Sequence, residues 1–161
     1  MCPDGHPEYH PDMATTYTSL LLHIIFSTKH RDPLITVSLE PELHAYVGGI
    51  CKANGSALLA ANGTADHIHL LISLGKTVSI SDLMLQVKRD SSTWIKSKGQ
   101  EFADFRWQEG YGAFSIGQSQ VEALRRYIAG QKEHHKTVPF RDELIEFLRR
   151  YEIPFEERYL D

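Results

Sequence analysis

The order of the apolar patterns along the chain is the feature that most restricts its fold. Short apolar runs typical of β-strands alternate with longer segments whose apolar residues recur at helical spacing. The patterns predict strands at residues 17–27, 56–61, 66–74 and 107–117 and helices at residues 38–55 and 80–98. The resulting order is strand, helix, strand, strand, helix, strand. Asn62-Gly63, between the second and third strands, is a strong signal for a hairpin turn. The order predicts an α+β fold, the ferredoxin-like split βαβ with an antiparallel sheet and helices on one face.

Two further helices are predicted toward the C-terminus. Residues 119–134 read as a helix that opens with a capping box between Ser119 and Glu122, and residues 141–151 read as a shorter C-terminal helix. At the other end, residues 1–13 contain three prolines that block regular structure, so we expect a disordered extension there. No internal repeat or linker divides the remainder, and we expect one domain over residues 14–161.

Composition restricts the function only in part. No apolar run approaches the ~18 residues of a membrane span, and the N-terminus lacks the basic cluster and apolar stretch of a secretory signal. The two cysteines, Cys2 and Cys51, have no metal-type or disulfide-type spacing, which predicts a cytoplasmic protein without a membrane partner. The net charge of −4 argues weakly against a nucleic-acid partner, but residues 14–139 hold 13 basic and 11 acidic residues. Charge alone therefore leaves DNA binding open.

Two histidines interrupt an otherwise apolar strand in the segment ADHIHLLI, residues 65–72. His67 and His69 are two residues apart, so on a strand they point to one side while Ile68 points to the other. Two unpaired imidazoles among apolar neighbours would cost about 1–3 kcal/mol each. A divalent metal would offset this cost, because neutral imidazole is the commonest metal ligand. The alternative is a pair of hydrogen-bonded histidines on a solvent-facing strand.

The predicted helix over residues 119–134 offers groups that could complete a metal site. Tyr127 and Gln131 are four residues apart and share a helix face beside an apolar stripe. No cysteine lies near the two histidines in sequence to form a soft zinc site. The alternative is an ordinary amphipathic helix with a boundary tyrosine and a solvated glutamine.

Four segments in this order, DHIHLLI, GYGAFSIGQSQ, YIAGQKEHH and IPFEERYLD, resemble the single-tyrosine HUH transposases of bacterial insertion sequences, the TnpA type. The resemblance covers roughly residues 16–161. It rests on a histidine–hydrophobe–histidine motif, a tyrosine 58 residues later and a glutamine four residues beyond. Gly130 departs from the family, in which many members carry a bulkier polar residue, and an interior helix glycine costs about 1 kcal/mol against alanine.

The resemblance implies a metal-dependent single-strand DNA transposase that cleaves and rejoins DNA at insertion-sequence ends through a 5′-phosphotyrosine. It implies that His67, His69 and Gln131 bind Mg²⁺ or Mn²⁺ and that Tyr127 is the nucleophile. Neutral nitrogen and amide oxygen ligands leave the full charge of the metal available to polarise a phosphate. A phenol with a pKa of about 10 is a poor nucleophile at neutral pH, so we expect the cation to help expose the phenolate.

The expected partners are single-stranded or hairpin DNA and a second copy of the chain. One tyrosine holds one cut end, and moving a DNA segment requires two, which predicts a homodimer. Gly117 precedes the tyrosine helix and is a candidate hinge or a simple strand-to-helix turn. Candidate DNA contacts are the basic residues Lys88, Arg89, Lys96, Lys98, Arg106, Arg125 and Arg126. Trp94 and Trp107 could stack on bases, although a solvated helix face over core tryptophans explains the same pattern.

The roles of three other histidines are not assigned, and two alternative functions stay open. His23 could reach the site, but a satisfied core histidine is the simpler interpretation, and His134 and His135 have no assigned role. One alternative function is a host-adopted, repeat-associated relative that binds hairpin DNA without active transposition. The other is a ferredoxin-like metal-binding module unrelated to DNA.

Overall fold

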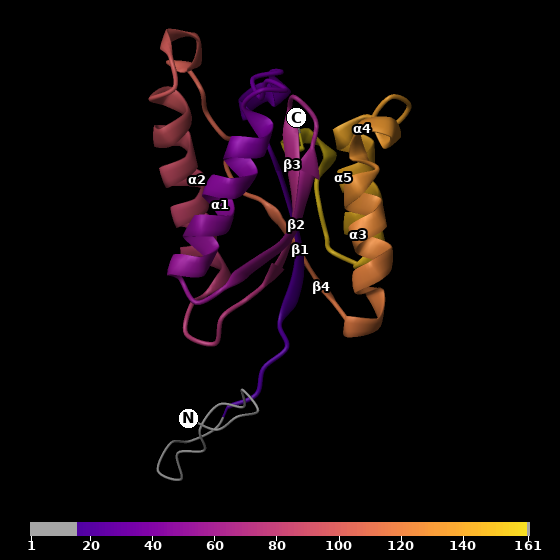
Figure 1. Cartoon of the computed structure of the whole chain (residues 1–161). Coiled ribbons are helices and arrows are strands. Elements are labelled where there is room, and N and C mark those ends of the chain that lie inside the picture. The colour runs from indigo at the N-terminus through magenta and orange to yellow at the C-terminus, as the bar shows by residue number, and fades with distance from the viewer. Residues whose placement is uncertain (1–15, 161) are drawn as a thin grey trace, which may run out of the picture.

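A four-stranded antiparallel sheet forms the centre of the computed structural model, which describes residues 16–160 (Figure 1). The strands are β1 (Leu21–Ser27), β2 (Ala57–Gly63), β3 (His67–Ser73) and β4 (Gly112–Ile116). They lie in the order β2-β3-β1-β4, so that β1 and β3 form the middle of the sheet. This is the ferredoxin-like order that the alternation of strands and helices predicts, and the fold class is confirmed.

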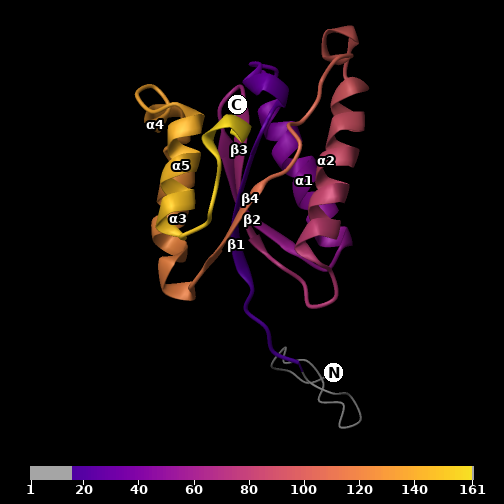
Figure 2. The same ribbon diagram turned by 180° about the vertical axis from the view of Figure 1, so that it is seen from behind.

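Helices cover both faces of the sheet (Figure 1, Figure 2). On one face lie α1 (Glu40–Ala53) and α2 (Ile80–Lys96), and on the other lie α3 (Val121–Ala129), α4 (Gln131–His134) and α5 (Phe140–Arg150). Short 3₁₀ turns occur at Lys29–Arg31, Gln100–Phe102, Gln118–Gln120 and Glu157–Tyr159. As predicted, α1 and α2 lie together on one face of the sheet. The later helices occupy the other face, because β1 and β3 bury apolar side chains on both sides.

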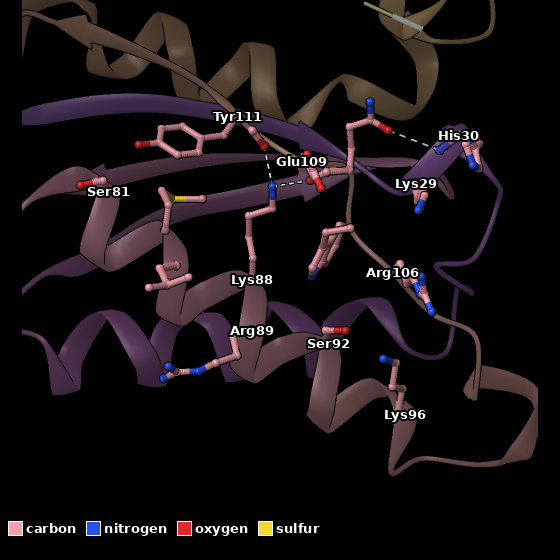
Figure 3. A pocket seen from close by; sticks show the side chains of 15 residues that line it. Lys29, His30, Ser81, Lys88, Arg89, Ser92, Lys96, Arg106, Glu109 and Tyr111 are labelled. Atoms are coloured by element: carbon pink, nitrogen blue, oxygen red, sulfur yellow. Dashed lines mark hydrogen bonds between the residues drawn. The ribbon is translucent and has the colours of Figure 1, made fainter.

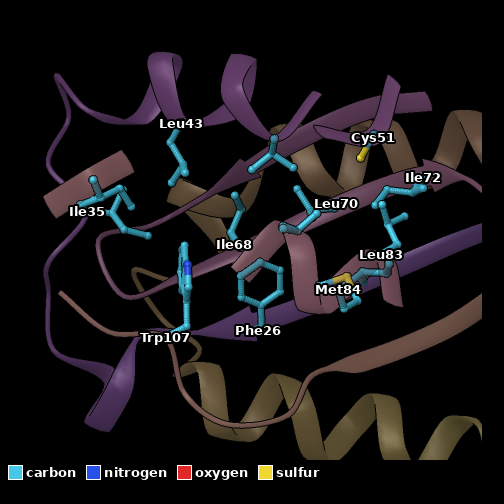
Figure 4. Close-up of a cluster of buried hydrophobic side chains, with 14 of the residues drawn as sticks. Phe26, Ile35, Leu43, Cys51, Ile68, Leu70, Ile72, Leu83, Met84 and Trp107 are labelled. Atoms are coloured by element: carbon cyan, nitrogen blue, oxygen red, sulfur yellow. The ribbon is translucent and has the colours of Figure 1, made fainter. Parts of the chain in front are cut away.

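The main hydrophobic core lies between the sheet and the pair of helices α1 and α2 (Figure 4). Phe26, Ile68 and Leu70 of the central strands are buried against Leu43 of α1 and Leu83 of α2. Fully burying such a side chain contributes about 1.5–3 kcal/mol. This layer therefore supplies much of the stability and fixes which side of β3 faces α1 and α2.

The opposite side of β3 carries the two histidines. His67, His69 and Leu71 alternate with Ile68 and Leu70, and therefore point toward α3, α4 and α5. A slip of one residue in the strand register would exchange the two sides. The apolar packing of Ile68 and Leu70 thus determines that both histidines share the other face, as their spacing predicts.

The hairpin between β2 and β3 turns later than the sequence predicts. Asn62 and Gly63 belong to β2, where they pair with His69 and Ile68, and the turn is formed by residues 64–66. The side-chain amide of Asn62 donates to two carbonyl oxygens at the end of α3, at 2.9 and 3.1 Å. The Asn-Gly pair therefore ties α3 to the sheet beside the histidines.

The helix predicted over residues 119–134 is shorter and is interrupted. No side chain caps the start of α3, so the predicted capping box is not formed. Instead, Oε1 of Gln120 accepts a hydrogen bond from the N–H of Gly117 at 3.0 Å. Gly130 lies between α3 and α4 with φ −88° and ψ 8°. The glycine that departs from the family pattern is thus the point where the helix breaks.

Two predictions concern the chain as a whole. The extension predicted for residues 1–13 lies outside the described residues, and a single domain over residues 14–161 stays a prediction. None of the helices within residues 16–160 has the length and apolar character needed to cross a bilayer.

Gly63 is required because the neighbouring strand approaches it closely. A Cβ at this position would overlap the main-chain carbonyl oxygen of His67. We predict that Gly63→Ala lowers the free energy of unfolding by on the order of 1–3 kcal/mol, because β2 or the start of β3 must shift. The control is Gly49→Ala in α1, where a Cβ meets no atom within 4 Å and alanine stabilises a helix by about 0.5–1 kcal/mol. Equal urea denaturation midpoints for the two variants would contradict the prediction.

Candidate metal centre

Side chains from β3 and from the helices behind it converge on one buried carboxylate. Glu143, in the first turn of α5, is 1% exposed. Its Oε1 lies 2.8 Å from Nε2 of His69 and 3.1 Å from Nε2 of His135. Its Oε2 accepts a hydrogen bond from the hydroxyl of Tyr127 and lies 3.1 Å from Nε2 of His134. Burial alone would raise the pKa of Glu143, but hydrogen bonds from His135, His69 and Tyr127 hold it well below its usual range.

His67 is oriented so that one ring nitrogen faces the cluster without a partner. Its Nδ1 lies 2.7 Å from Oδ1 of Asp66 and 2.9 Å from Oγ1 of Thr64. Because a carboxylate only accepts, Nδ1 of the neutral ring carries the proton and Nε2 keeps its lone pair. This Nε2 is buried, has no hydrogen-bond partner and lies 3.9 Å from Oε1 of Glu143. A carboxylate behind the ring is the usual support of a metal-binding histidine.

His69 is held between Glu143 and His23 of β1. Its Nδ1 lies 2.8 Å from Nε2 of His23, and its Nε2 bonds to Glu143. Burial lowers the pKa of His69 to about 4, although Glu143 opposes this effect, and burial together with His69 lowers the pKa of His23 to about 3. Both rings are neutral near pH 7, which is the form that binds a metal. His23 is thus a hydrogen-bonded core histidine that supports His69.

Tyr127 and Gln131 both contribute to this region, although the helix break separates them. The ring centroid of Tyr127 lies 5.9 Å from that of His69. Burial raises the pKa of the Tyr127 phenol, and its hydrogen bond to Glu143 raises it further. Gln131 is fully buried, its Nε2 lies 3.4 Å from the carbonyl oxygen of Tyr127, and its Oε1 has no hydrogen-bond partner.

The donor atoms of this cluster suit a divalent cation. One atom from each of His67, His69, His135 and Glu143 lies within 4.8 Å of the others. Atoms bound to one ion at about 2.0–2.2 Å lie about 3–4.4 Å apart, so small movements would bring these atoms into coordination. Nε2 of His67 has no hydrogen-bond partner, and the unpartnered Oε1 of Gln131 is a further lone pair that an ion could satisfy.

Glu143 is the residue that the sequence interpretation missed. It lies 74 positions after His69, in a helix that the sequence predicts only as the C-terminal closure of the fold. The available signal is its spacing from Phe140 and Phe147, which places an acid on the buried apolar face of α5. His135, which the sequence leaves without a role, contacts this acid directly.

Four of the seven predicted DNA-contact residues line one groove on the α2 side of the sheet (Figure 3). The groove has a volume of about 880 Å³, and Tyr111 contributes an exposed ring to it, whereas Trp107 lies at its base, buried in the main core. Its basic lining residues are Lys29, Lys88, Arg89, Lys96 and Arg106. Since the histidines face α3, α4 and α5, this groove is separate from the metal centre.

Two of the predicted lysines have structural partners. The ammonium of Lys88 donates to the carbonyl oxygens of Gln108 and Gly110, and burial lowers its pKa to about 8. Lys88 therefore fixes the segment that leads into β4. Lys98 pairs with Glu42 of α1 at 2.8 Å and does not line the groove.

The remaining predicted residues are distributed over the α3 region and α2. Nη1 of Arg125 donates to the carbonyl oxygen of Leu59 at 2.6 Å, whereas Arg126, next to Tyr127, is exposed. Trp94 stacks on a tyrosine of α1 with the ring centroids 4.8 Å apart, away from the groove. Gly117 has φ −84° and ψ 158°, which is extended backbone, and its function as a hinge stays a prediction.

Fold and site together define a ferredoxin-like protein whose sheet carries a buried histidine–carboxylate centre beside a helix tyrosine. The sequence matches the IS200-like transposase family over residues 16–131, which is most of the chain, and the protein therefore belongs to this family. The transposases for insertion sequence element IS200 of Salmonella typhimurium and Salmonella typhi are each 25% identical to it over 132 residues. Each match covers 77% of this chain and 84% of the relative.

Two solved structures have a similar fold. The crystal structure of a protein assigned as a transposase of Deinococcus radiodurans has a TM-score of 0.58 and 21% identity, and the match covers 76% of this chain and 98% of that chain. The structure of a REP-associated tyrosine transposase bound to a REP hairpin has a TM-score of 0.57 and 14% identity. This match covers 83% of this chain and 76% of that chain. At these identities the likeness establishes the fold.

We predict that the protein loses stability as the pH falls from about 7.5 to about 5. His69 and His23 have pKa values of about 4 and about 3 in the folded state, against about 6.5 in an unfolded chain. Below pH 6.5 the unfolded state therefore binds more protons. The stability contributed by the neutral rings is complete above pH 6.5 and is lost as the pH falls toward 4. At pH 5 the loss is on the order of 2 kcal/mol for each histidine.

Urea denaturation of the metal-free protein at the two pH values measures this loss. His23→Gln should reduce the pH dependence because it removes one of the two buried imidazoles. His30→Gln, at an exposed position in the 3₁₀ turn Lys29–Arg31, is the matched control and should retain it. A denaturation midpoint that does not change with pH would show that these rings do not stay neutral in the folded protein.

Proposed function

We propose that the protein is a metal-dependent single-strand DNA transposase, with Tyr127 as the nucleophile and His67, His69 and Gln131 as ligands of Mg²⁺ or Mn²⁺. The observation that carries this proposal is that Tyr127 lies beside the histidine pair, where three buried polar atoms lack hydrogen-bond partners. These atoms are Nε2 of His67 and Oε1 of Gln131, both on proposed ligands, and Nε2 of His134. Membership of the IS200-like transposase family supports DNA as the substrate.

The proposed reaction is transesterification at a DNA phosphate. A divalent ion bound at this site would polarise the phosphate and stabilise the negative charge that develops on it. The phenolic oxygen of Tyr127 bonds to phosphorus, the bond from phosphorus to the 3′ oxygen breaks, and the proton of the phenol passes in the end to that oxygen. The products are a 5′-phosphotyrosine and a free 3′-hydroxyl. The reverse reaction rejoins DNA without ATP, because the covalent link conserves the phosphodiester bond energy.

The raised pKa of Tyr127 has a consequence for this reaction. The phenol is protonated at neutral pH in the metal-free protein, where it donates its hydrogen bond to Glu143. A nearby cation favours the phenolate, so the proposed cleavage requires both the tyrosine and the metal.

We infer that single-stranded or hairpin DNA binds along the basic groove of Figure 3. Lys96 and Arg106 offer charges to phosphates, and the exposed Tyr111 offers a ring to bases. The structurally similar REP-associated tyrosine transposase is bound to a REP hairpin, which makes a hairpin a candidate ligand here. Arg126 is a candidate contact at the metal centre because it is exposed beside Tyr127.

A homodimer acting in the cytoplasm is the proposed assembly. Each chain supplies one Tyr127 and can hold one cut end, so two chains are needed to hold both ends of a segment. The edge strands β2 and β4 leave backbone groups through which two sheets could join. If the tyrosine helix exchanges between chains, Gly117 is the candidate hinge.

Tyr127→Phe is predicted to abolish formation of a covalent protein–DNA adduct. Labelled single-stranded DNA from the flanks of the gene would be incubated with protein and Mn²⁺ and separated on a denaturing gel. The variant lacks the oxygen that bonds to phosphorus. A chelator added to the wild-type reaction should prevent adduct formation, because it removes the metal. Tyr159→Phe, at an exposed position near the C-terminus, is the matched control and should form the adduct.

The possible results separate the alternatives. An adduct that survives Tyr127→Phe would assign the nucleophile to another residue. Hairpin binding without any adduct would favour a repeat-associated DNA-binding protein. Tight zinc binding with neither adduct nor DNA binding would favour a metal-binding module unrelated to DNA.

Substitution of Lys96 and Arg106 by alanine is predicted to weaken single-stranded DNA binding and reduce its salt dependence. Each lost phosphate contact should reduce the slope of log K against log salt by about 0.7. Fluorescence anisotropy at several salt concentrations measures both quantities. Lys52→Ala, at an exposed position in α1 outside the groove, should leave them unchanged. Equal slopes for the double variant and the wild type would exclude the groove as the DNA site.

A further inference from the structure

We propose that Glu143 is a further ligand of the metal site, so that a carboxylate from α5 joins His67 and His69 at the ion. This inference rests on the proposed metal-dependent function and adds a residue to it. It concerns which side chains bind the ion, and it is testable without measuring catalysis.

The positions of the donor atoms carry the proposal. Oε1 of Glu143 lies 2.8 Å from Nε2 of His69, 3.1 Å from Nε2 of His135 and 3.9 Å from Nε2 of His67. Of these nitrogens, that of His67 is buried, has no hydrogen-bond partner and faces the carboxylate. An ion placed among these atoms would satisfy His67 and replace the hydrogen bonds that the other histidines now make to Glu143.

The burial of Glu143 provides a second reason. A carboxylate that is 1% exposed is costly unless positive charge or several hydrogen bonds compensate it. Within residues 16–160 its ion-pair partners are all histidines, namely His67, His69, His134 and His135. A divalent cation would supply the compensating charge. Two histidines and one carboxylate are also a known ligand set that leaves coordination positions open, which here would accept phosphate oxygens.

The second oxygen of Glu143 connects the metal to the nucleophile. Oε2 accepts the hydrogen bond from the hydroxyl of Tyr127, while Oε1 faces the histidines. With Oε1 bound to the ion, the same carboxylate holds the tyrosine hydroxyl beside the metal. Glu143 would thus be a ligand and, through its hydrogen bond, a positioning residue for Tyr127.

Isothermal titration of the metal-free protein with Mn²⁺ tests the proposal. Glu143→Gln keeps the shape of the side chain but removes its charge. It should weaken Mn²⁺ binding about 10-fold or more, because the loss of even an outer partner of a metal ligand costs about 10–100-fold. The matched control is Glu146→Gln on the same helix, where the glutamate is exposed and pairs with Arg150 at 3.1 Å. Its Mn²⁺ affinity should equal that of the wild type. Equal or tighter binding by Glu143→Gln would overturn the proposal.

A second measurement uses the wild type and therefore does not depend on the folding of a variant. In crystals soaked with Mn²⁺, the anomalous signal should lie within bonding distance of a Glu143 carboxylate oxygen and of His67 and His69. An ion held by His67, His69 and Gln131, with the carboxylate turned away, would overturn the proposal.

The adduct assay separates the two proposals from each other. Wild-type protein that binds Mn²⁺ through Glu143 but forms no Tyr127 adduct would contradict the transposase function and support the ligand assignment. Wild-type protein that forms the adduct while Glu143→Gln retains full Mn²⁺ affinity would support the function and exclude Glu143 as a ligand.

Discussion

The alternation of side chains along β3 is the constraint on which the rest of the structure depends. Ile68 and Leu70 enter the core formed with α1 and α2, and this burial forces His67 and His69 to the other face. That face cannot be left to apolar residues alone, because two imidazoles must be satisfied there. The cover formed by α3, α4 and α5 supplies both the apolar contacts of Phe140 and the polar group that the histidines require.

One carboxylate makes this polar interior compatible with folding. Glu143 accepts hydrogen bonds from groups that arrive from β3, from α3 and from the segment after α4, so a single buried charge connects three parts of the chain. Buried polar networks are stable only when nearly all of their members are satisfied. Here three buried atoms are the exceptions, since Nε2 of His67, Oε1 of Gln131 and Nε2 of His134 have no hydrogen-bond partner. The same network that holds the layers together therefore leaves buried atoms without a partner beside a group of residues that could hold an ion.

Local pattern was sufficient for most of the fold but failed where an interaction was distant. The order of strands and helices emerged from periodicity, because alternation and helical spacing are properties of neighbouring residues. The prediction of a turn at Asn62-Gly63 was wrong, because both residues belong to β2 and Asn62 donates hydrogen bonds to the end of α3. The sequence also did not predict that Lys98 forms an ion pair with Glu42 or that Arg125 donates to a carbonyl oxygen of β2.

The sequence by itself determined that His67 and His69 share one side of a strand, whereas Tyr127 and Gln131, predicted on one helix, lie in α3 and α4 on either side of Gly130. Spacing of two on a strand fixes the first relation locally, while the second depends on how the chain continues after the break at Gly130. Only the tertiary structure decided that Glu143 lies between them, because its place depends on how α5 packs Phe140 and Phe147 against the sheet. A contact across 74 positions is decided by that packing and leaves no periodic trace in the chain.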